Sequence, residues 1–333
     1  MDSNPPPKPS KTPEPRKGPR GFCVCLLIAS AIVCAVVWHR GGILRTADSW
    51  RYLAAASGNW ARLTHWPPLY PLALAVAGDL WTAILSLAAL LAICWSAGGP
   101  VALMLVASSS TVASLYGLVL SEVLFLPLAA LALLEADRGR ADRCAVAISA
   151  ACLTRYLGVL LVPVCALSLP RRRWWVLAMA VLPAASWMAL HGDGARQVSR
   201  LSLWSAYADA CAWAIPWGGL RTRVALGTLA WALLVALGRG SWARWIAVYP
   251  VAVICMASAT YIGSPGDCGG RMLAAVVPAI AVTIGKLLRV RTSCGTIRLP
   301  ERRGRKAKAP KATERRGDGR DHNPRRRGEG SGS

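Results

Sequence analysis

Long apolar runs recur from residue 22 to residue 288, and this repetition limits the possible folds more than any other feature of the sequence. The runs bring hydrophobic residues to 54% of the 333 residues and the mean hydropathy to +0.40, values higher than those of ordinary soluble domains. Inside a bilayer, a helix satisfies all of its backbone N–H and C=O groups within one segment. The sequence therefore predicts an all-α fold, a polytopic bundle of transmembrane helices.

Arginines in the short turns between the runs predict which turns lie in the cytoplasm. Arg138, Arg140 and Arg143 crowd one turn, and three consecutive arginines from residue 171 form another, so both turns are expected inside. An odd number of crossings cannot join two points on one side of a membrane. We therefore expect the run between them to go out and return, reversing at Arg155; the alternative is a single span with Arg155 buried against a partner.

With that reversal the sequence predicts about ten crossings, a multi-pass protein of the cell membrane with both termini in the cytoplasm. The expected crossings are Phe22–Trp38, Leu80–Ala97, Val101–Tyr116, Val119–Leu134, two within Ala145–Leu169, then Trp174–Leu190, Val224–Leu237, Ala243–Ile262 and Arg271–Leu288. Phe22–Trp38 could also be read as a signal peptide, but it ends in Trp-His-Arg instead of a small-residue cleavage site.

The two ends of the chain carry most of the positive charge. Residues 1–20 are rich in proline and basic, and residues 286–333 hold sixteen Lys or Arg against five Asp or Glu. We predict a disordered cytoplasmic leader (1–20), a transmembrane domain (21–290) and a disordered cytoplasmic tail (291–333). A basic tail can bind nucleic acid, but attraction to anionic membrane lipids is the favoured interpretation, so no nucleic-acid partner is expected.

One polar, aromatic passage, DSWRYLAAASGNWARLTHWPPLYP at residues 48–71, interrupts the apolar runs of the first half. It holds an isolated carboxylate, Asp48, among tryptophans and tyrosines that suit a membrane interface. The two consecutive prolines fix the backbone and set the angle at which the next helix begins. The passage predicts a rigid loop on the outer face, where we place the chemistry.

This passage resembles the first outer loop of the GT-C superfamily of polytopic glycosyltransferases, such as protein O-mannosyltransferases and aminoarabinose transferases. The resemblance is carried by Asp48, Tyr52, Gly58 and the stretch WPPLYPLALA, with shorter echoes at Ser121-Glu122 and further along the chain. It implies a GT-C-like fold and transfer of a sugar from a polyprenyl-phosphate carrier to an acceptor at the exterior face. The residues specify neither the sugar nor the acceptor.

The resemblance and the chemistry together suggest a role for each candidate residue. Asp48 is the expected catalytic group that activates or orients the acceptor hydroxyl. Arg155 and Arg271 are expected to hold the lipid phosphate, because the guanidinium fork matches phosphate oxygens. Glu122 either positions a sugar hydroxyl or pairs with Arg155. The remaining candidates for substrate binding are Tyr52, His65 and Tyr70.

Cofactors and disulfides receive little support from the sequence. His65 stands where some of these enzymes carry an acid, and Asp48 is alone where several have acidic pairs, which argues against a bound divalent metal. No other cofactor is predicted. Cys211 and Cys268 are both expected outside, where they could pair if their loops meet.

A non-catalytic transporter or lipid-binding scaffold is the alternative function. In such a protein the same charges would line a pathway. A transporter is expected to carry ionisable groups near mid-membrane and often shows repeated halves, whereas these runs are nearly free of charge and show no repeat. That contrast favours the glycosyltransferase.

Overall fold

The structure is a computed structural model that describes residues 20–63, 66–170, 173–191, 219–238, 240–260 and 274–295. In these ranges every regular element is a helix and no strand occurs, which confirms the all-α prediction for this part of the chain. The α-helices are α1 (Arg20–Arg40), α2 (Ala47–Ala56), α3 (Leu69–Ala107), α4 (Ser110–Tyr116), α5 (Glu122–Asp137), α6 (Ala141–Thr154), α7 (Leu161–Ala166), α8 (Trp174–Met179), α9 (Leu182–His191), α11 (Leu220–Leu237), α12 (Ser241–Thr260) and α14 (Val277–Gly295). The 3₁₀ helices are η1 (Trp60–Arg62), η2 (Tyr156–Leu160) and η4 (Ala274–Val276).

Two of the described helices are long and apolar enough to cross a membrane, Gly21–Arg40 within α1 and Leu69–Ala107, which is α3. The apolar helices α5 and α6 are shorter, with 16 and 14 residues. At a rise of 1.5 Å per residue these helices extend about 24 Å and 21 Å, less than a hydrocarbon core of roughly 30 Å. The ten predicted crossings therefore stay a prediction.

Helix α3 is divided by two glycines, close to the boundaries that the sequence predicts. Gly78 and Gly99 have φ of 72° and 78°, and Pro100 follows the second. Only glycine adopts this backbone region without steric cost, so the helix direction changes at both positions. The expected crossing Val101–Tyr116 is also divided, because α3 ends at Ala107 and the Ser109 side chain caps α4 by accepting a hydrogen bond from the Val112 N–H.

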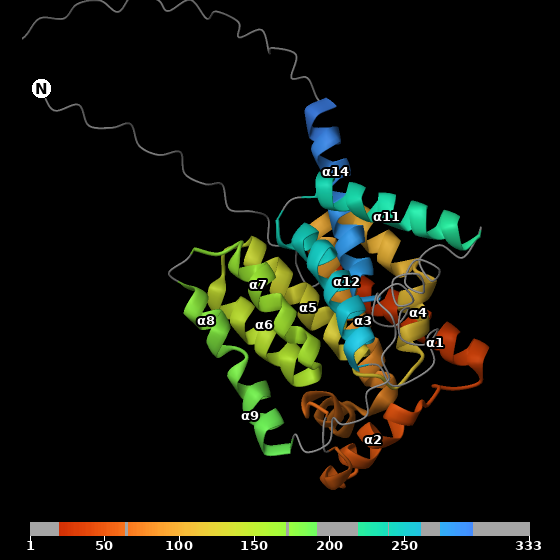
Figure 1. The fold of residues 1–333 in the computed structure, drawn as a ribbon. Helices are drawn as coiled ribbons and strands as arrows, with labels where there is room; N and C mark the ends of the chain where they lie inside the picture. Colours follow the sequence, from red (N-terminus) through yellow and green to blue (C-terminus); the bar gives the residue numbers. More distant parts are fainter. Residues whose placement is uncertain are drawn as a thin grey trace, which may run out of the picture. The chain divides into compact units, whose positions relative to one another are not determined.

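The chain reverses at Arg155, between α6 and η2. Arg155 is extended, with φ −151° and ψ 135°, and Gly158 lies so close to the backbone of Ala151 and Cys152 that a side chain would clash there. Helix α7 then returns beside α5, where Cys165 Sγ lies 3.9 Å from the Ala132 carbonyl. Figure 1 shows α5, α6 and α7 side by side. The predicted reversal is present; its side of a membrane stays a prediction.

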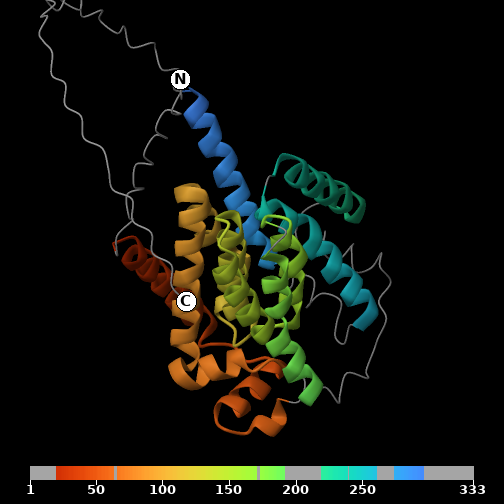
Figure 2. The same ribbon diagram turned by 90° about the vertical axis from the view of Figure 1, so that its left-hand side faces the viewer.

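Figures 1 and 2 show α2 and α14 at opposite ends of the helical core. In Figure 1 α11 lies across the direction of α12, so the expected inward crossing Val224–Leu237 does not run parallel to the central helices. The Trp231 indole fixes this crossing by donating to the Ile246 carbonyl over 2.9 Å. A helix in this orientation packs against its neighbour without adding a layer to the bundle.

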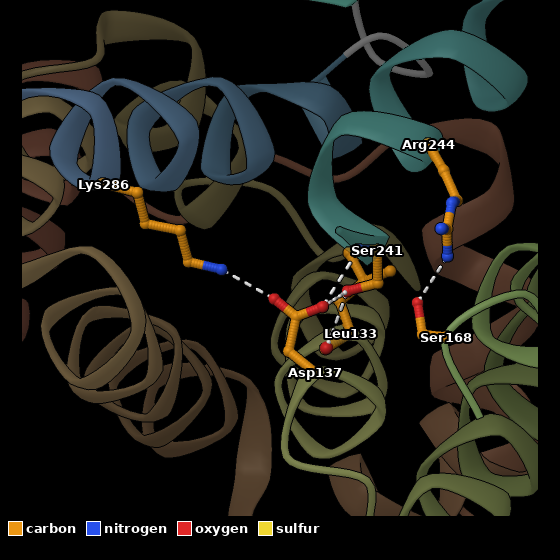
Figure 3. A network of polar contacts seen from close by, with 6 residues as sticks. All are labelled: Leu133, Asp137, Ser168, Ser241, Arg244 and Lys286. Atoms are coloured by element: carbon orange, nitrogen blue, oxygen red, sulfur yellow. Dashed lines mark hydrogen bonds and ion pairs between the residues drawn. The ribbon is translucent and has the colours of Figure 1, made fainter. Parts of the chain in front are cut away.

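A polar network of Asp137, Ser241 and Lys286 joins α5, α12 and α14 (Figure 3). We call this end of the helices, together with Glu135 of α5, the basic end. Asp137 Oδ2 lies 2.6 Å from Lys286 Nζ, and its Oδ1 accepts from the Ser241 N–H over 2.9 Å. The Ser241 hydroxyl lies 2.8 Å from the Leu133 carbonyl. Glu135, 3% exposed, accepts from Arg138 over 2.9 Å. Asp137 and Glu135 therefore each have a cationic partner.

We expect Asp137→Ala to lower the melting temperature of the purified protein in detergent. The change leaves the buried Ser241 N–H without its acceptor, and an unsatisfied buried donor costs about 1–3 kcal/mol. Asp142→Ala is the matched control, because Asp142 is an exposed carboxylate in the first turn of α6. Equal melting temperatures for the two variants would show that the network does not hold these helices together.

Candidate functional site

The first loop is fastened to the segment that precedes α5. Thr46 caps α2 through a reciprocal pair of hydrogen bonds with Ser49. The fully buried Ser49 hydroxyl donates to the Val119 carbonyl over 2.7 Å, and a short bridge pairs Leu44 with Leu118. These contacts place α2 against the N-terminus of α5, so residues 48–56 meet a segment seventy positions away.

Tyr52 makes the central contact between the loop and α5. It lies four residues after Asp48 on α2, so the two residues share one helix face. Its hydroxyl donates to Ser121 Oγ over 3.2 Å, and its side chain is 1% exposed. Its ring packs edge-on against Trp66 and Tyr70, with centroid separations of 5.7 and 5.0 Å. The tyrosine is thus held by both its ring and its oxygen.

Glu122 and Arg155 form an ion pair next to the contact between Tyr52 and Ser121. Arg155 Nη1 meets Glu122 Oε1, and the two side chains are 15% and 7% exposed. Glu122 Oε2 lies 3.4 Å from the Ser121 hydroxyl. The chain of contacts runs from Tyr52 through Ser121 and Glu122 to Arg155, which we call the site relay. It links α2, α5 and the turn after α6.

Burial raises the pKa of Tyr52, and the negative charges of Glu122 and Asp48 act in the same direction, while Arg155 and the Ser121 hydrogen bond oppose them. The phenol therefore stays protonated and remains a hydrogen-bond donor. Burial lowers the pKa of Arg155, but the Glu122 carboxylate together with Tyr249 and Tyr52 outweighs it, and the net shift is upward. The guanidinium therefore stays charged, and the site holds a permanent cation beside two acids.

Five of the seven candidate residues come together at this end. Asp48, Tyr52 and Glu122 lie close enough for the two carboxylates to influence the phenol, and Tyr70 and Arg155 contact members of the same group. His65 and Arg271, like Cys211 and Cys268, lie outside the described residues.

The geometry changes the expected role of two residues. Of the alternatives for Glu122, pairing with Arg155 is the one present. Arg155 is expected at an exterior tip, yet it is largely buried because Glu122 draws its side chain inward.

Sequence reasoning misses Ser121 and Tyr249 as members of the site. Ser121 is 1% exposed and connects Tyr52 to Glu122. The sequence marks it only as part of the short resemblance at Ser121-Glu122 and as the neighbour of an isolated acid. Tyr249 of α12 lies near Arg155 and packs in a tilted arrangement against Trp245, with a centroid separation of 4.5 Å. A single tyrosine in an apolar run resembles any interfacial aromatic residue, so the sequence around Tyr249 does not indicate that it belongs to the site.

Among the residues that the structure describes, no group of three or more His, Cys, Asp or Glu side chains is arranged to hold a metal ion. Comparison with known proteins finds no family model, no curated protein and no solved structure that matches this chain. Any assignment of function must therefore come from the site itself.

We expect Glu122→Gln and Arg155→Gln each to lower stability by about 3–5 kcal/mol, because each leaves one buried charge without its partner. The double variant should lose clearly less than the sum of the two, since neither charge then remains. Thermal unfolding in detergent measures all three. The matched cycle uses Asp142→Asn and Arg143→Gln, two exposed residues, for which the losses should be small and additive; additivity at the site would show that the pair is not coupled.

Proposed function

We propose that this chain is an integral-membrane glycosyltransferase of the GT-C type, which moves a sugar from a polyprenyl-phosphate carrier to an acceptor at the exterior membrane face. The supporting observation is the convergence of Asp48, Tyr52, Glu122 and Arg155 from three separate segments at one end of the helices. An acid and a guanidinium within one cluster are the groups that sugar transfer from a phosphate requires.

In the proposed reaction, the acceptor oxygen attacks the anomeric carbon of the sugar as the bond from that carbon to the phosphate oxygen breaks. Asp48 takes the proton of the acceptor hydroxyl. The departing lipid phosphate keeps the electron pair of the broken bond, and Arg155 with Arg271 stabilises its charge. The sugar inverts its anomeric configuration because attack and departure occur on opposite faces.

In this proposal the two buried tyrosines of the site support the loop and do not contact the substrate. Tyr52 and Tyr70 are 1% and 2% exposed, and their rings pack against each other. We assign them to support of the loop, where they hold Asp48 in place, although the resemblance suggests them as substrate contacts. His65 remains a proposed contact for the sugar or the acceptor.

The proposed orientation puts the basic end in the cytoplasm and the site relay at the outer leaflet, with both termini inside. Arg138, Arg140 and Arg143 lie at or beside the basic end, in agreement with the distribution of positive charge in membrane proteins. The polytopic arrangement of about ten crossings belongs to the same proposal. Membrane lipids are then partners along the apolar faces.

A transporter or lipid-binding scaffold is the competing function, and the buried Glu122–Arg155 pair is the observation that favours it. Paired ionisable residues between helices are typical of transport pathways. The two functions differ in what Asp48 does, because only the enzyme needs a group that accepts a proton from a second substrate.

We expect Asp48→Asn to reduce sugar transfer by about 10²–10⁴-fold, since the amide cannot take the proton of the acceptor. The assay supplies radiolabelled polyprenyl-phosphate hexoses to the purified protein and compares initial rates. Asp142→Asn, the exposed acid on α6, is the matched control and should retain full activity. Unchanged turnover in Asp48→Asn would remove this residue from the mechanism.

The orientation can be tested with single cysteines in a cysteine-free background. Val159→Cys lies in the turn after Arg155, where Val159 is 45% exposed, and should react with an impermeant thiol reagent on intact cells. Val146→Cys, on α6 where Val146 is 71% exposed, should stay unlabelled because it faces lipid. Protection of position 159 equal to that of position 146 would contradict the exterior placement of the turn.

A further inference from the structure

The Glu122 carboxylate occupies the contact that the proposed function reserves for a phosphate. Its Oε1 meets Arg155 Nη1, and its Oε2 lies near the Ser121 hydroxyl, so both oxygens have partners. Ser121 in turn accepts from Tyr52 over 3.2 Å. The carboxylate is therefore held against the guanidinium by a fixed set of side chains.

A carboxylate and a phosphate compete for the same guanidinium. Arginine binds either anion through parallel N–H groups, and the planar fork fits both. Once Arg155 is paired with Glu122 the pair has no net charge, so its attraction for a second anion is weak. Asp48 adds another negative charge near the same cluster. The described residues of the site therefore disfavour binding of the phosphate that the proposed function places there.

If the Glu122 carboxylate leaves Arg155, it has a second favourable position at the N-terminus of α5. It is the first residue of α5, and the preceding Ser121 makes no side-chain capping bond to that helix. Carboxylates in a first helical turn are stabilised by the unpaired backbone N–H groups of that turn and by the helix dipole. Rotation of the side chain toward this end of α5 would exchange one stabilising contact for another.

Resting on the proposed function, we propose that Glu122 is a built-in competitor for the lipid-linked phosphate: it holds Arg155 when the donor is absent and is displaced when the donor binds. The contact with Glu122 keeps the buried guanidinium of Arg155 ordered and paired between turnovers. It also selects for ligands that bring further contacts, because a free phosphate ion lacks the polyprenyl chain whose burial helps to displace the carboxylate. Glu122 is a positioning residue and a determinant of donor affinity.

The test measures binding of a polyprenyl phosphate that carries no sugar to the purified protein, for the wild type, Glu122→Gln and a matched control. Glu135→Gln is the control, because Glu135 is also a buried glutamate paired with arginine, but it lies at the basic end. We expect Glu122→Gln to bind at least about tenfold more tightly than the wild type, within the range of coupling measured for close charge pairs. Glu135→Gln should bind as the wild type does.

A gain of affinity separates this role from a structural one, since mere loss of packing would weaken binding. If Glu122→Gln does not fold, Glu122→Asp provides the second variant: its shorter side chain withdraws the carboxylate from Arg155 and should also tighten binding. If the wild type binds the polyprenyl phosphate and a folded variant binds it no more tightly, the inference is overturned and the proposed function stays intact. Failure of both proteins to bind would overturn both.

Discussion

The ion pair between Glu122 and Arg155 is the contact on which the arrangement of the site depends. Two opposite charges with little exposure are stable only when each satisfies the other, so the N-terminus of α5 and the turn after α6 must meet. Ser121 and Tyr52 extend this constraint to the first loop. These contacts add to the Ser49 hydrogen bond and the Leu44–Leu118 bridge that also fix the first loop to the helical core.

Much of this arrangement is predictable from the sequence because apolar length and arginine-rich turns are local signals. The all-helical class, the break near Gly78 and the reversal at Arg155 all follow from them. Asp48, Tyr52 and Glu122 also stand out as polar residues in apolar surroundings. These features need no knowledge of how distant segments pack.

Other features depend on packing between segments, so no local signal reports them. The division of Val101–Tyr116 into two helices results from a serine cap that competes with the apolar run. The crossing of α11 over α12 is fixed by an indole that reaches a carbonyl on the neighbouring helix. Tyr249 joins the site only because α12 passes beside Arg155. Apolar length predicts a helix, but not its tilt or its neighbours.

The relay from Tyr52 to Arg155 has a consequence for the order in which substrates act. One end, Tyr52, lies on α2 together with Asp48, the proposed acid of the acceptor side. The other end, Arg155, is the proposed cation of the donor side. Because consecutive members touch, movement of the carboxylate alters the hydroxyl beside it and then the phenol. In the proposed reaction, donor binding that displaces Glu122 therefore also alters the contacts that hold α2, the helix that carries Asp48.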